Sequence, residues 1–176
     1  MLIEGNSKNF QTMTKFRPCT QNVWAVGCPA RTSAIFISDR DGVSEVSNDI
    51  SKSKNSNFLL APCRTLKSIF HEYGIHHINF FSLDVEGFEA EVIATIDFDR
   101  VKIDVMIVEL DKLGSGDKVK SAAKNERVHQ LLTAGGMYRM PSDTKDIPPC
   151  QKEKKSSSTL YGSALYVSKE FRDDIC

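Results

Sequence analysis

Short apolar runs alternate along the chain with segments in which apolar residues recur at helical spacing. We expect strands at 2–3, 22–26, 33–38, 78–83 and 103–108, and helices at 7–16, 65–73, 88–96 and 125–134. Strands that alternate with helices are typical of parallel strands joined by crossover helices. The pattern therefore predicts an α/β fold with helices on the flanks of a sheet.

Local signals set the ends of several of these elements. Asn6 or Ser7 can cap the helix at 7–16, and Pro18 follows its end. Gly74 is suited to end the helix at 65–73 in a left-handed conformation. Near the end of the chain, 137–140 and 160–167 are expected to pair as an antiparallel hairpin. The polar stretch 39–57, rich in Ser and Asn, predicts a surface loop.

Composition limits the size and the partners of the protein. A chain of 176 residues with 40% hydrophobic and 26% charged residues fits one soluble domain, 1–176. Lys plus Arg equals Asp plus Glu at 23 each, so no global positive field attracts nucleic acid. No run approaches the ~20 apolar residues of a membrane helix. These features predict a chain without a membrane segment.

The cysteines indicate a reducing environment. Five are present, an odd number, and none of them forms a CxxC pair. We expect reduced thiols and a cytoplasmic location. An anchor upstream would instead favour the endoplasmic reticulum or Golgi. The five are Cys19, Cys28, Cys63, Cys150 and Cys176.

Carboxylates follow three of the predicted strands. Glu4, Asp84 and Glu109 each stand where an apolar run ends. In an open α/β sheet, ligands bind in the crevice at the carboxyl ends of the strands. We expect the three acids to line one rim of the sheet.

The stretch DVEG, residues 84–87, contains two acids directly after one of these predicted strands. Alternation places Asp84 and Glu86 on the same side of the strand end, and Gly87 permits a tight turn into the next helix. Helix capping by either acid is an equally good interpretation. We expect Glu89 and Glu91 on the solvated face of that helix.

Acids crowded at a rim repel one another, by roughly 4 kcal/mol for a pair about 4 Å apart at an effective dielectric near 20. Protons, a metal ion or a cationic ligand must relieve this repulsion. A hard cation suits such carboxylates, but no dedicated calcium loop is present, and we predict no metal. An acid that ends an early strand can instead accept hydrogen bonds from a ribose, as Glu4 would. A sulfonium cofactor combines a ribose with a positive charge.

Trp24 is expected in the core.

Three segments resemble the FkbM family of methyltransferases: LIEGN at 2–6, SLDVEGFEAEVI at 82–93 and VKIDVMIVEL at 101–110. The resemblance implies a Rossmann-like class I fold, S-adenosylmethionine as the cofactor, and O-methylation of a hydroxyl on a small molecule or sugar. It further implies that Glu4, Asn6, Val26 and Asp84 contact the cofactor. Asp84 and Glu86 are the catalytic candidates, and the resemblance leaves open which of them is the general base.

One feature of the family is not found in the sequence. The family's glycine-rich cofactor loop follows a first strand that precedes the acid corresponding to Glu4, and only three residues precede Glu4 here. We therefore expect a fragment, a truncated gene model or a degenerate copy that lacks the first strand and helix, leaving unpaired sheet edges through which the chain could form oligomers. Such a fragment could be inactive on its own.

A second hypothesis is non-catalytic. Some animal relatives resemble the protein Star and are associated with trafficking from the endoplasmic reticulum to the Golgi. A glycine-rich loop upstream would favour the enzyme, whereas an apolar span of about 20 residues upstream would favour trafficking.

Overall fold

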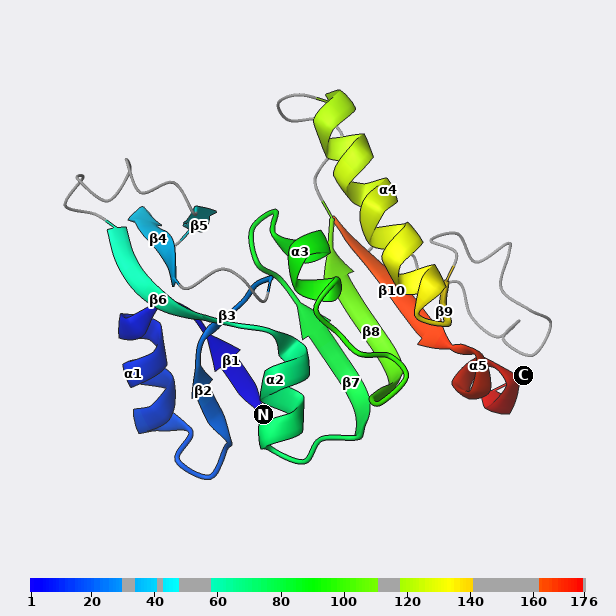
Figure 1. The fold of residues 1–176 in the computed structure, drawn as a ribbon, viewed down its shortest axis with the longest axis horizontal. Helices are drawn as coiled ribbons and strands as arrows, with labels where there is room; N and C mark the ends of the chain where they lie inside the picture. Colours follow the sequence, from blue (N-terminus) through cyan, green and yellow to red (C-terminus); the bar gives the residue numbers. More distant parts are fainter. Residues whose placement is uncertain (30–33, 41–42, 48–57, 111–117, 141–161, 176) are drawn as a thin grey trace, which may run out of the picture.

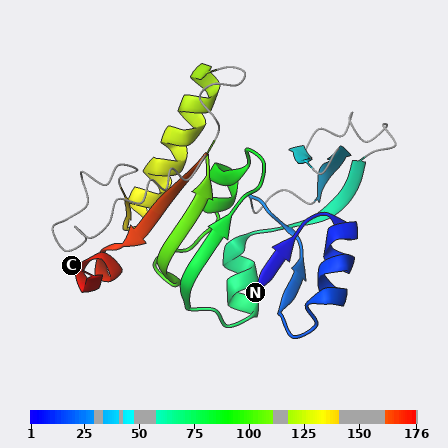
Figure 2. The same ribbon diagram turned by 180° about the vertical axis from the view of Figure 1, so that it is seen from behind.

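The computed structural model describes residues 1–29, 34–40, 43–47, 58–110, 118–140 and 162–175. These residues form a mixed α/β structure with helices flanking three separate sheets (Figures 1 and 2). The prediction of an α/β fold with flanking helices is confirmed, and the strands form three sheets where one Rossmann-like sheet lacking its first strand was expected. No helix in this part of the chain is long and apolar enough to cross a membrane.

The largest buried cluster surrounds a four-stranded sheet with the order β7-β8-β10-β9. Its strands are β7 (His77–Leu83), β8 (Lys102–Glu109), β10 (Ser163–Ser168) and β9 (Met137–Arg139). β7 and β8 are parallel, and β10 runs antiparallel to both of its neighbours. The predicted segments 137–140 and 160–167 correspond to β9 and β10, which pair antiparallel. β10 lies between β9 and β8 in the sheet. The connection between β9 and β10 lies outside the described residues.

Helices cover this sheet. α3 (Glu89–Ile93) follows β7, and α4 (Lys118–Ala134) lies across β10 and β9, with α5 (Lys169–Ile175) after β10 (Figure 1). α4 begins earlier than predicted from its apolar spacing. Residues between these helices and the sheet, from both, are almost fully buried, and they include Ile93, Met106, Val108, Leu132 and Tyr166.

A two-stranded sheet carries the start of the chain. β1 (Leu2–Glu4) pairs in parallel with β2 (Asn22–Trp24), and α1 (Ser7–Phe16) joins them. Asn6 caps α1, because its Oδ1 accepts hydrogen bonds from the backbone N–H groups of Lys8 and Asn9 at 2.9 and 3.3 Å. The strand and the helix with its cap were both predicted.

The third sheet has the order β3-β6-β4-β5. It contains β3 (Val26–Gly27), β6 (Phe58–Arg64), β4 (Ala34–Arg40) and β5 (Val43–Ser47), and α2 (Leu66–Glu72) follows β6. The prediction of a loop over 39–57 is wrong at 39–40, which end β4, and at 43–47, which form β5. Residues 48–57 lie outside the described part. β6 was not predicted. Pro62, which cannot donate a ladder hydrogen bond, pairs with Ala34 at the end of the β4–β6 ladder.

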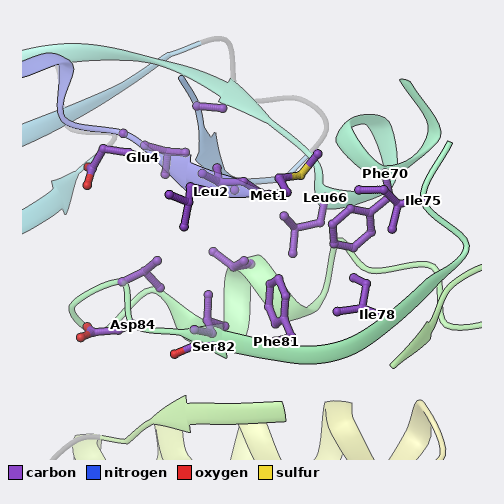
Figure 3. A pocket seen from close by; sticks show the side chains of 18 of the residues that line it. Met1, Leu2, Glu4, Leu66, Phe70, Ile75, Ile78, Phe81, Ser82 and Asp84 are labelled. Atoms are coloured by element: carbon purple, nitrogen blue, oxygen red, sulfur yellow. The ribbon is translucent and has the colours of Figure 1, made fainter. Parts of the chain in front are cut away.

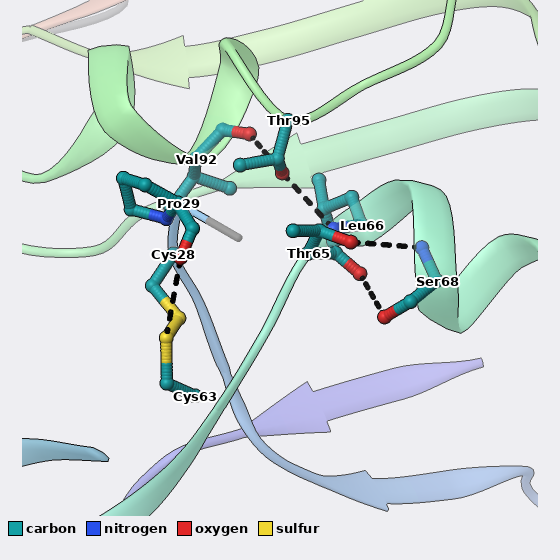
Figure 4. The surroundings of a disulfide bond; sticks show 8 residues. All are labelled: Cys28, Pro29, Cys63, Thr65, Leu66, Ser68, Val92 and Thr95. Atoms are coloured by element: carbon teal, nitrogen blue, oxygen red, sulfur yellow. Dashed lines mark hydrogen bonds between the residues drawn. A yellow bond between two sulfur atoms is a disulfide. The ribbon is translucent and has the colours of Figure 1, made fainter. Parts of the chain in front are cut away.

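A disulfide joins β3 to β6 (Figure 4). Cys28 and Cys63 are bonded, with their Cα atoms 5.6 Å apart. The prediction of reduced thiols is therefore wrong for these two residues. The parallel pairing of β3 with β6, in which Val26 lies opposite Cys63, brings Cys28 close to Cys63. The spacing of the cysteines in the sequence does not reveal this proximity. Cys19 is free and exposed, and Cys150 and Cys176 lie outside the described residues.

Candidate functional site

The parallel pairing of β7 and β8 brings two carboxylates together. Leu83 pairs with Val108, so Asp84, which follows β7, lies beside Glu109, the last residue of β8. One carboxylate oxygen of each lies within 4.8 Å of the other. Two carboxyl groups can share a hydrogen bond only when one of them is protonated, because an ionised carboxylate is an acceptor only.

Glu109 keeps its proton to unusually high pH. The hydrogen bond to Asp84 raises the pKa of Glu109 from 4.5 to about 7, with burial and the negative charges of Asp84, Glu86 and Glu89 adding to the effect. At neutral pH the Asp84–Glu109 pair therefore exchanges a proton readily. A group with this pKa is suited to accept a proton from a ligand under physiological conditions.

The turn after β7 holds a third carboxylate against the pair. Glu86 and Gly87 have left-handed backbone conformations, with φ values of 53° and 89°. Oε1 of Glu89 accepts hydrogen bonds from the backbone N–H groups of Val85 and Gly87, both at 3.1 Å. Glu89 is only 6% exposed.

The prediction that Glu89 lies on the solvated face of its helix is thus wrong. Glu89 is the first residue of α3, and its side chain turns back to the preceding loop and satisfies two of the loop's donors. Glu91, which was assigned to the same face, is partly buried.

Asp84, Glu89 and Glu109 form a compact group of acids. One carboxylate oxygen from each lies within 4.8 Å of the others. Such a group can hold a proton, as the raised pKa of Glu109 indicates, or it can ligate a hard cation through oxygen.

A pocket of about 790 Å³ opens beside this group (Figure 3). Its walls come from β1 and β7, and it is closed by α2 and by the turn after β7. Figure 3 shows Glu4 and Asp84 at one end of the pocket and Phe70, Ile75 and Ile78 at the other. The pocket therefore has an acidic end at the rim and an apolar end.

The predicted residue Glu4 lines the acidic end. Its Oε1 accepts a hydrogen bond from the backbone N–H of Asn6 at 2.7 Å, which fixes the carboxylate at the end of β1. The indole Nε1 of Trp24 donates to the carbonyl of Gly5 at 3.0 Å, and its ring stacks on Phe10. Trp24 is 42% exposed, so the prediction of a core tryptophan is wrong.

The other predicted site residues fall in different places. Glu86 and Val26 line the pocket together with Glu4 and Asp84. Asn6 is 2% exposed, and its side chain caps α1 instead of lining the pocket. Gly27 packs so closely that an added Cβ would lie 2.9 Å from Cγ1 of Val92, which explains a glycine at the end of β3 without invoking a ligand.

Sequence comparison identifies the class of protein. The profile of the methyltransferase FkbM domain matches residues 20–139. This range contains Asp84, Glu89 and Glu109 and begins after β1, so Glu4 lies outside it. The chain matches no curated protein and no solved structure.

Proposed function

The chain belongs to the FkbM methyltransferase family, and we propose that it transfers a methyl group from S-adenosylmethionine to a hydroxyl oxygen of a small molecule or sugar. The observation that carries this proposal is the Asp84–Glu109 pair: Asp84 lines the pocket, and Glu109, whose pKa is raised to about 7, lies beside it. Transfer to a hydroxyl requires the loss of its proton, which such a pair can accept.

The acidic end of the pocket suits the cofactor. When bound, S-adenosylmethionine supplies an electrophilic methyl group on a positively charged sulfonium. The carboxylate of Glu4 would accept hydrogen bonds from the ribose hydroxyls, and its bond from the N–H of Asn6 already orients it. Asp84 and Glu86 would face the positive charge, and Val26 would give an apolar wall. The pocket volume of about 790 Å³ lies within the range of ligand sites.

Residues of the chain have separate roles toward the methyl acceptor. The ionised carboxylate of the Asp84–Glu109 pair would accept the proton of the acceptor hydroxyl. Glu89 stays in place through its two backbone hydrogen bonds and keeps the turn rigid. Glu86 lines the pocket and is exposed, so it is placed to orient a hydroxylated acceptor.

Methyl transfer from isotopically labelled S-adenosylmethionine to a panel of sugars and small hydroxylated molecules tests this proposal. We expect the rate to rise with pH and level off above about 7, and Asp84→Asn to lower it by about 10²–10⁴-fold. Glu126→Gln, an exposed acid on α4, is the matched control. Transfer that is independent of pH from 5 to 9, or unchanged in Asp84→Asn, contradicts the assigned base.

The disulfide supports a proposal about the compartment. Structural disulfides persist in oxidising compartments and are rare in the cytosol. The bond between Cys28 and Cys63 therefore supports a lumenal location, such as the endoplasmic reticulum or Golgi, over the cytoplasmic one predicted from the cysteine count. Alkylation of the denatured protein with and without reduction tests the bond on which this rests: two additional modified cysteines after reduction are expected, and their modification without reduction contradicts it.

A further inference from the structure

The disulfide fastens a very short strand that forms part of the pocket wall. β3 is two residues long, and both residues, Val26 and Gly27, line the pocket. They pair with Cys63 and Arg64 at the end of β6. The covalent bond from Cys28 to Cys63 therefore holds this part of the wall where the ladder is shortest (Figure 4).

The disulfide lies in a small apolar cluster that is separate from the main core. Val26, Cys28 and Ala61 are its buried members, and Cys63 and Phe88 pack against them. The buried residues of the main core, around the β7-β8-β10-β9 sheet, include none of these three. Segments with few buried contacts open at a lower free energy than the core of a protein. Loss of the bond should therefore loosen the small cluster and leave the main core folded.

The small cluster also supports the turn that carries the acids. Phe88 directly follows this turn and packs against both the small cluster and the main core. Asp84 and Glu86 line the pocket from the same turn. Gly27 lies against Val92 of α3, which is another residue of the pocket wall. A displacement of β3 would thus change the apolar wall and the support of the acidic end together.

The two sulfur atoms differ in their accessibility. Cys28 is fully buried, whereas Cys63 is partly exposed. Thiol–disulfide exchange requires a thiolate to reach one of the two sulfurs, so the attack falls on Sγ of Cys63. Sγ of Cys28 is then the leaving group.

We propose that the bond between Cys28 and Cys63 is a redox switch of the pocket, opened by a dithiol that attacks Sγ of Cys63. The first thiolate of the dithiol forms a mixed disulfide with Cys63, and Cys28 leaves and takes up a proton. The second thiolate displaces Cys63, which also takes up a proton. The dithiol is oxidised to a disulfide by two electrons, and the protein ends with two thiols.

The two redox states differ in the order of the pocket wall. In the oxidised state the bond holds β3 against β6, and the wall is formed. In the reduced state β3 is free to separate from β6. The consequence for cofactor binding rests on the function proposed above, whereas the change in the backbone of β3 does not.

Hydrogen exchange of residues 26–28 and 85–88, with and without dithiothreitol, tests the switch. The chain used carries Ser in place of Cys19, Cys150 and Cys176, which leaves the bonded pair as its only cysteines. The matched control carries Cys28→Ser and Cys63→Ser in addition, and dithiothreitol should not change its exchange. Binding of S-adenosylhomocysteine and the circular dichroism spectrum are measured on the same samples.

We expect the amides of 26–28 and 85–88 to exchange at least about 10-fold faster after reduction, because the wall opens more often. Reoxidation should restore the slow exchange. The reduced chain should keep the circular dichroism spectrum of a folded protein. It should bind S-adenosylhomocysteine at least about 5-fold more weakly, because the apparent affinity falls with the fraction of molecules in which the wall is formed.

Three results overturn the switch. They are equal exchange at 26–28 in the two redox states, unfolding of the whole chain on reduction, and equal affinity for S-adenosylhomocysteine before and after reduction. An oxidised chain that does not bind S-adenosylhomocysteine contradicts the proposed function instead, and hydrogen exchange at 26–28 and 85–88 then decides the switch by itself.

Discussion

The protonated state of Glu109 makes stability depend on pH in a direction opposite to that of most acids. Its pKa in the folded protein is about 7, against 4.5 for an unperturbed glutamate. Between these values the folded state holds the proton and the unfolded state does not. The free energy of unfolding should therefore fall as pH rises from about 4.5 to about 7 and then level off.

The size of the effect follows from the same shift. Each pKa unit corresponds to about 1.4 kcal/mol, so a rise from 4.5 to about 7 sets an upper bound of about 3.5 kcal/mol. Glu109 is partly exposed, and solvent at the rim screens the repulsion, which leaves about 1–2 kcal/mol. Glu109→Gln retains the shape and a hydrogen-bond donor but cannot ionise, so it should lose this dependence.

Urea unfolding followed by circular dichroism measures the effect at pH 5 and pH 8. Going from pH 5 to pH 8, the wild type should lose about 1–2 kcal/mol more than Glu109→Gln does. Glu126→Gln, on the exposed face of α4, should behave like the wild type. Equal pH dependence in the wild type and Glu109→Gln would refute the shared proton.

The metal alternative is tested in the same experiment. EDTA is present in the first series, and Mg²⁺ replaces it in the second. A cation held by Asp84, Glu89 and Glu109 would keep Glu109 ionised and remove the pH dependence only in the second series. An unchanged pH dependence in Mg²⁺ is the result that proton sharing predicts.

Two further changes probe the surroundings of the site. Glu89→Ala should cost about 2–3 kcal/mol, because it leaves the N–H groups of Val85 and Gly87 without their acceptor; a loss in urea unfolding no larger than that of Glu91→Ala would contradict this. Replacing Cys28 and Cys63 together with Ser should cost about 2–4 kcal/mol. Dithiothreitol should destabilise the wild type by a similar amount and leave the double variant unchanged, and equal sensitivity of the two proteins would count against the bond.

The elements that the sequence predicted well are those fixed by local signals. The cap at Asn6 defines α1, and the apolar run before Glu109 defines β8, because capping and burial act within a few residues. Asp84 and Glu109 could be placed at one rim from sequence, since consecutive parallel strands end at the same edge of a sheet. Their hydrogen bond depends on register, which the sequence does not specify.

The features that escaped prediction depend on distant parts of the chain. The disulfide requires β3 to pair with β6, and β6 contains a proline that argues against a strand. The spacing of Ala90, Ile93 and Ile96 marks another face of the helix as the buried one, which placed Glu89 in solvent. The left-handed turn at Glu86 and Gly87 instead draws its carboxylate inward. The only local signal for this was an acid two residues after the glycine of a tight turn.

Binding of S-adenosylhomocysteine, measured by calorimetry, tests most directly whether this pocket is a cofactor site. We expect the wild-type chain to bind at one site, and Glu4→Gln to weaken binding by about 10- to 100-fold, the loss of a hydrogen bond to a charged group. Glu126→Gln should bind like the wild type. A folded wild-type chain that does not bind, or a Glu4→Gln variant that binds equally well, would contradict the account.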